Sequence, residues 1–155
     1  MFGNILLALL TSKLLLINFS NAKLDAEKIV GGFRVRNQSS VSYQISLQYR
    51  QGHFCGGSFI RTNVVLCAAH CVYNRSVSDF EIRAGSLQRN SGGKIIKVSN
   101  IIMHESYNPN NFDYDYSLVF LEDYDSSGLI MSIIQLPSSE SDIVPDNTTL
   151  FVSGW

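Results

Sequence analysis

The sequence predicts an all-β fold, a barrel or a sandwich built from short strands. Residues 42–49 and 80–85 alternate between apolar and polar side chains, as strands with one buried face do. Turn-forming residues separate these runs from several other short apolar runs. Apart from about one turn near Ala68–Val72, no stretch shows convincing helical periodicity.

The expected strands follow one another along the chain after Ile29. They lie in residues 42–49, 59–60, 63–69, 80–85, 94–98 leading into 101–103, and 117–121. The turns between them contain Gln51-Gly52, Ser91-Gly92-Gly93, Asn108-Pro109-Asn110-Asn111 and Ser126-Ser127-Gly128.

Residues 131–150 differ from these runs. They carry Pro137, Pro145 and many Ser and Asp residues, so we expect an extended connector. Phe151–Trp155 then begins a further element.

Length and composition are those of one globular domain. The chain has 155 residues, of which 45% are apolar and 16% charged, and its net charge is −1. This balance gives no basic surface for nucleic acid or for an anionic membrane, so neither is expected as a partner.

Residues 1–22 are predicted to be a secretory signal peptide. Met1–Leu10 is almost entirely apolar, and Ser20 and Ala22 supply small residues for cleavage. A membrane-spanning helix would need roughly 20 apolar residues with few charges, whereas Lys13 interrupts this stretch. The position of Lys13 inside the apolar stretch, rather than before it, is unusual for a signal peptide. We expect a secreted, extracellular protein.

Secretion would permit disulfides and N-glycans. Cys55 and Cys71 are candidate disulfide partners, and closing that loop would stabilise the fold by about 3 kcal/mol. Asn37, Asn74 and Asn147 each begin an Asn-X-Ser/Thr sequon and are candidate glycosylation sites.

His70 and Asp115 are the candidate catalytic residues. His70 precedes Cys71, so a bridge to Cys55 would clamp the segment that carries it. Asp115 enters an apolar strand, where an acid needs a partner, and an imidazole is a suitable one. His53 and His104 are expected to be structural or surface residues, and the neighbouring Asp113 a solvated loop residue.

Five short motifs together resemble the landmarks of the trypsin/chymotrypsin family of serine proteases. They are Ile29-Val30-Gly31-Gly32, Cys55-Gly56-Gly57-Ser58, Ala68-Ala69-His70-Cys71, Asp115-Tyr116-Ser117-Leu118 and Ser153-Gly154-Trp155. They occur in the family's order and at about its separations, and they extend over residues 29–155. Residues 91–107 are similar to arthropod digestive trypsins, mites included.

The resemblance implies a fold of two barrels. This chain would supply the first antiparallel barrel of six strands, a connector and the first strand of a second barrel that is otherwise missing. Residues 29–155 would then be the truncated N-terminal half of a peptidase domain.

The resemblance also implies a secreted endopeptidase that is made as a zymogen and acts on proteins or peptides. His70 would be the general base, Asp115 would hold its tautomer, and Cys55 and Cys71 would form the bridge. Residues 23–28 would be an activation propeptide, and an activating trypsin-like protease would cut between Lys28 and Ile29. The freed Ile29 amine would pair with an acid beside the nucleophile.

The family's nucleophile motif, Gly-Asp-Ser-Gly-Gly, does not occur in this sequence. We therefore expect a fragment without peptidase activity of its own. The alternative is a catalytically inactive, protease-like secreted protein that binds protease inhibitors or other proteins.

Two other departures concern Cys67 and metals. Cys67 stands where the family usually has Thr or Ser; it could be a buried small side chain, weaken the polar support of Asp115, or pair with sequence outside this chain. The loop from Gly85 to Lys97 has no acidic residue, so calcium is not supported, and no zinc spacing occurs. No metal and no cofactor are expected.

Overall fold

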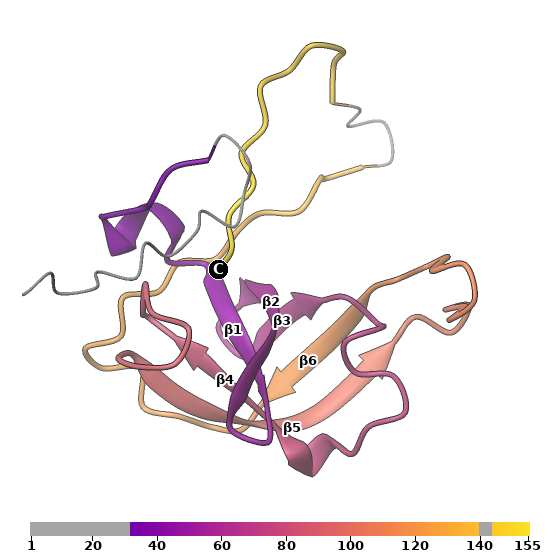
Figure 1. The fold of residues 1–155 in the computed structure, drawn as a ribbon, viewed down its shortest axis with the longest axis horizontal. Coiled ribbons are helices and arrows are strands. Elements are labelled where there is room, and N and C mark those ends of the chain that lie inside the picture. Colours follow the sequence, from indigo (N-terminus) through magenta and orange to yellow (C-terminus); the bar gives the residue numbers. More distant parts are fainter. Residues whose placement is uncertain (1–31, 140–143) are drawn as a thin grey trace, which may run out of the picture.

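A closed barrel of six antiparallel strands forms the centre of the computed structural model, which describes residues 32–139 and 144–155 (Figure 1). The strands are β1 (Gln44–Tyr49), β2 (Gly52–Arg61), β3 (Val64–Cys67), β4 (Phe80–Ala84), β5 (Lys94–Met103) and β6 (Ser117–Leu121). Around the barrel they follow the order β1-β2-β3-β6-β5-β4. The predicted all-β class is therefore confirmed, and so is the antiparallel barrel of six strands that the family resemblance implies.

The predicted signal peptide, the predicted propeptide and the Lys28–Ile29 bond lie outside the described residues. The helices within the described part are the short 3-10 turns η1 (Gln38–Val41) and η2 (Val77–Asp79). Neither is long and apolar enough to cross a membrane. The helical turn expected near Ala68–Val72 is a hydrogen-bonded turn rather than a helix.

The barrel is filled by apolar side chains. The fully buried ones come from β1, β2, β3, β4 and β6, and they are Ile45, Leu47, Phe59, Val65, Ile82 and Val119. In β4 and β6 buried and half-buried residues alternate, as the sequence predicts for strands with one inward face. A barrel of six strands is narrow enough for side chains to fill it completely.

Strand β1 departs from the prediction, because both of its faces are buried. Ser46 and Gln48 should point to solvent, yet they are 0% and 1% exposed. The loop that follows β4 covers them, and the Gln48 side-chain amide donates to the carbonyl of Arg89 at 2.9 Å. Because the covering loop supplies hydrogen-bond partners, the polar groups of these side chains remain hydrogen-bonded when they are buried.

Strand β2 is longer than the apolar run at 59–60 suggests. It begins at Gly52 and includes the Cys55–Ser58 motif, in which glycines interrupt the alternation that marks a strand. This extension brings Cys55 alongside Leu47 of β1.

The connector after β6 is extended, as predicted. In its described part, residues 131–139 and 144–150, it contains no strand or helix. The Ile134 N–H donates to the carbonyl of Phe59 at 2.9 Å, which holds the connector against β2. The C-terminal segment then returns to β1, where the Ser153 hydroxyl donates to Gln44 Oε1 at 2.7 Å (Figure 1).

Candidate catalytic site

His70 and Asp115 lie together at one end of the barrel. The ring Nδ1 of His70 is 2.7 Å from Asp115 Oδ2, and the backbone N–H of His70 donates to Asp115 Oδ1 at 2.7 Å. A carboxylate at Nδ1 favours the tautomer that carries its proton there and leaves a lone pair on Nε2. The His70 side chain is 47% exposed, so Nε2 can accept a proton from a bound molecule.

The segment that carries His70 is held on both sides. Before it, Ala69 is fully buried, and its carbonyl accepts hydrogen bonds from the N–H groups of Val72 and Tyr73 at 3.0 and 2.9 Å. After it, Cys71 is bonded to Cys55 on β2, with 6.3 Å between the two Cα atoms. The predicted bridge is present, and it fixes the position of the imidazole.

Asp115 sits in the loop between β5 and β6. Just after it, the buried hydroxyl of Ser117 lies 3.2 and 3.1 Å from the carbonyls of Cys67 and Ala68. Since Ala68 comes two residues before His70, this hydroxyl ties the start of β6 to the segment that carries the imidazole. Ser117 therefore helps to hold the loop that carries Asp115 against this segment.

The carboxyl group of Asp115 has a lowered pKa. Partial burial acts to raise the pKa, but the hydrogen bonds from the His70 ring and backbone, together with the charge of the imidazolium, outweigh it. Asp115 therefore remains ionised at neutral pH and can stabilise a protonated His70.

Phe112 is a site residue that the sequence analysis did not identify. Its ring meets the His70 ring edge-on, with 5.7 Å between centroids and 82° between planes. The side chain is 57% exposed, and the backbone adopts φ of +59°. Only its place three residues before Asp115 could have pointed to it, because a turn in this unusual conformation is not visible in residue type.

The disulfide lies next to the reactive nitrogen. Cys71 Sγ is 3.4 Å from His70 Nε2. Cys55, His70 and Cys71 place ligand-type atoms within 4.8 Å of one another, but both sulfurs are used in the disulfide. They offer no thiolate, and the group is not a metal centre.

Cys67 is the free cysteine, and it is buried. Its thiol donates to the carbonyl of Gly56 at 3.2 Å. Burial raises the pKa of this thiol to about 11. This hydrogen bond is directed to β2 and not to Asp115, which favours the interpretation of Cys67 as a buried small side chain.

The other two histidines lie apart from the pair. His53 Nδ1 is 2.7 Å from the Ser46 hydroxyl, and the pKa of His53 is lowered by burial and by the charge of Arg89. His104 stacks on Tyr114 at 4.6 Å between centroids. In the described part of the chain neither forms a hydrogen bond or an ion pair with Asp115, consistent with the structural roles expected for them.

The three candidate glycosylation sites are all exposed. Asn74 and Asn147 have φ of +55° and +64°, whereas the Asn37 side chain accepts a hydrogen bond from the Ser39 N–H. Their use as acceptors remains a prediction.

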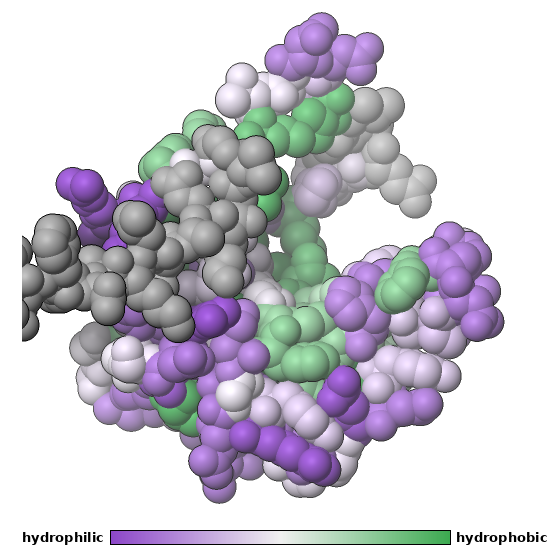
Figure 2. All heavy atoms as spheres, viewed as in Figure 1, coloured by the Kyte–Doolittle hydropathy of each residue, from purple (hydrophilic) through white to green (hydrophobic). Residues whose placement is uncertain are grey.

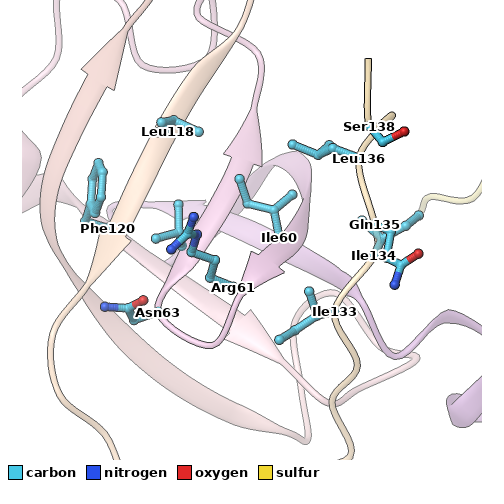
Figure 3. Close-up of a pocket in the computed structure, with 11 residues that line it drawn as sticks. Ile60, Arg61, Asn63, Leu118, Phe120, Ile133, Ile134, Gln135, Leu136 and Ser138 are labelled. Atoms are coloured by element: carbon cyan, nitrogen blue, oxygen red, sulfur yellow. The ribbon is translucent and has the colours of Figure 1, made fainter. Parts of the chain in front are cut away.

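A separate apolar groove lies on the outside of the barrel. It has a volume of about 930 Å³ and lies between β2, β3 and β6 on one side and the connector on the other. Figure 3 shows Ile133 and Leu136 of the connector pointing toward Ile60 of β2. Neither His70 nor Asp115 lines this groove.

Comparison with known proteins gives a consistent result. The family model described as Trypsin matches residues 29–155. The chain is 43% identical over 114 residues to Trypsin Blo t 3 of Blomia tropicalis, a match covering 73% of this chain and 42% of that protein. It is 41% identical over 128 residues to Trypsin beta of Drosophila erecta, covering 83% of this chain and 49% of that protein.

Among solved structures, a scabies mite inactivated protease paralogue, S-D1, superposes with a TM-score of 0.66 at 28% identity. The match covers 76% of this chain and 50% of that one. The chain thus spans about half the length of the relatives it matches.

Proposed function

This chain belongs to the trypsin family of serine proteases, and on that premise we propose that the protein is a secreted serine endopeptidase made as a zymogen. The hydrogen-bonded pair of His70 and Asp115, at 2.7 Å, carries the proposal. The exposed Nε2 of His70 supports a role as general base, and the ionised Asp115 supports stabilisation of the imidazolium.

In the proposed reaction, His70 Nε2 takes the proton of a serine hydroxyl as that oxygen attacks the scissile carbonyl. The same nitrogen then returns the proton to the amine that leaves. Among the described residues, no serine hydroxyl hydrogen-bonds the His70 ring. The nucleophile and its oxyanion hole are therefore proposed to come from sequence beyond these 155 residues.

Activation is proposed to follow cleavage between Lys28 and Ile29 by a trypsin-like enzyme. Secretion is supported by the Cys55–Cys71 disulfide, because disulfides persist in oxidising compartments. Protein and peptide substrates follow from the family.

The test is hydrolysis of a peptide library by the mature protein, produced with all sequence its transcript encodes after Trp155. Cleavage that His70→Ala lowers by about 1000-fold or more would support the proposal. The 29–155 segment alone should show no cleavage above its own His70→Ala variant. Equal rates for the complete protein and its His70→Ala variant would contradict the proposed activity.

A second candidate is a catalytically inactive, secreted binding protein. The similarity to an inactivated protease paralogue of scabies mite favours it. Against it stands the intact His70–Asp115 pair, which a protein without catalysis does not need. The hydrolysis experiment separates the two, because an inactive paralogue would not respond to His70→Ala.

A further inference from the structure

Arg75 forms a cationic surface with two aromatic rings, those of Tyr49 and Phe54. The guanidinium of Arg50 also lies over the Tyr49 ring, 5.1 Å from its centroid. The guanidinium carbon of Arg75 lies 4.4 Å from the ring centroid of Tyr49 and 4.4 Å from that of Phe54. The two rings are themselves 5.8 Å apart. Stacking on aromatic faces restricts a guanidinium and leaves the N–H groups at its edge free to bind.

The charge of Arg75 is available to a partner. Arg75 is exposed, and no carboxylate among the described residues forms an ion pair with it. The nearby Asp79 is taken by Arg50, whose Nη2 lies 3.5 Å from its Oδ2. The surface therefore presents a fixed, unneutralised guanidinium, a group suited to bidentate binding of a carboxylate.

This surface is connected to the catalytic pair through the disulfide. Phe54 directly precedes Cys55, and Arg75 follows Cys71 by one compact turn in which the Arg75 N–H donates to the carbonyl of Val72 at 3.3 Å. Such a turn keeps its first and last Cα atoms within about 7 Å. The backbone of Arg75 thus lies within a few residues' length of the disulfide and of His70.

The chemistry of the reaction indicates which part of a substrate would pass there. The nitrogen of the leaving amine must come within hydrogen-bond distance of His70 Nε2 to receive its proton. Cys71 Sγ is already 3.4 Å from that nitrogen. A chain that left the scissile bond past this sulfur, advancing about 3.3 Å per residue, would bring about its third residue to Arg75.

We propose that Arg75, held on Tyr49 and Phe54, selects substrates with an acidic side chain two to four residues after the scissile bond. This inference rests on the proposed endopeptidase function.

The test compares peptides that differ only in Asp or Asn at those positions, using the mature protein with all sequence encoded after Trp155. The parent should cleave the Asp peptide with a kcat/KM about 2- to 5-fold higher than that of the Asn peptide. This is the range expected from the free energy of an exposed ion pair. This preference should disappear in Arg75→Gln and in 0.5 M salt, since salt screens exposed charges. Arg61→Gln, at the far end of β2, removes an equal charge and should keep it.

Two outcomes would overturn the inference while leaving the endopeptidase intact: no preference in the parent, or a preference that Arg75→Gln retains. If the parent cleaves neither peptide above its His70→Ala variant, the proposed function itself fails. Fluorescence anisotropy with the same labelled peptides then decides the inference: tighter binding of the Asp peptide that is lost in Arg75→Gln supports it, and equal affinities contradict it.

Discussion

Asp115 accepts hydrogen bonds from both the ring and the backbone of His70. The backbone bond fixes the carboxylate relative to the main chain, so the ring bond can orient the imidazole without depending on a flexible side chain. Removal of the carboxylate would therefore affect both the orientation of the imidazole and the negative charge beside it.

Asp115→Asn should lower the thermal stability of the mature protein at neutral pH and remove part of its acid sensitivity. Because the pKa of Asp115 is lowered on folding, its contribution is present above the unfolded pKa and is lost as pH falls through the folded pKa. The Tm difference between parent and Asp115→Asn, measured from pH 7 to pH 2, should shrink below about pH 4. Asp123→Asn, which removes an exposed carboxylate, serves as the control. A Tm difference between parent and Asp115→Asn that stays constant with pH would contradict the lowered pKa of Asp115.

At the scale of elements, the connection between β4 and β5 contains glycines with positive φ, and one of them leaves no room for a side chain. Gly93 has φ of +60°, and a Cβ there would lie 2.1 Å from the carbonyl oxygen of Ala84. The backbone would have to move to accommodate any side chain. This movement would disturb the register of β4 with β5, in which Ala84 pairs with Lys94.

Gly93→Ala should therefore destabilise the mature protein by about 3 kcal/mol or more, from backbone strain together with the clash. Gly128→Ala is the matched control: φ is +71°, but a Cβ would meet nothing within 4 Å, so only the strain of about 1 kcal/mol remains. Denaturant unfolding of both variants measures the difference. If both variants lost the same free energy of unfolding, the close contact at Gly93 would not contribute to the destabilisation.

At the scale of the whole molecule, the catalytic pair depends on contacts between distant parts of the chain. Asp115 is 45 positions from His70, and the barrel brings them together through the pairing of β3 with β6. Apolar residues also remain on the surface, including those of the groove and of the C-terminal segment that rises above the barrel (Figure 2). Contiguous apolar surface of this kind is typical of a face that another part of a protein or a partner covers.

The disulfide is expected to stabilise the mature protein by about 3 kcal/mol, the chain-entropy estimate for a loop of 16 residues. The double variant Cys55→Ala/Cys71→Ala should lose about that amount in denaturant unfolding. Cys67→Ala, which removes the buried free thiol, should lose only about 1 kcal/mol. A double variant no less stable than Cys67→Ala would contradict a clamping role for the bridge.

From the sequence alone followed the all-β class, most strand positions, the family and the pairing of Cys55 with Cys71, together with the choice of His70 and Asp115 as candidate catalytic residues. These features are local: alternation marks β4 and β6, and short motifs carry the chemistry. Alternation of residue type left a barrel and a sandwich open, and the family resemblance implied the barrel. The structure confirms the barrel, which closes through the pairing of β1 with β4, two strands that are distant in sequence.

The surroundings of individual residues, by contrast, become visible in the folded chain. The loop after β4 covers the second face of β1, the Cys67 thiol meets Gly56, the Phe112 ring meets His70, and Arg75 lies on Tyr49 and Phe54. None of these contacts leaves a periodic trace in the sequence. Each contact joins two segments that strand register and the path of a loop bring together. Alternation of residue type shows which face of a strand is buried in the core, but it does not show what covers the opposite face.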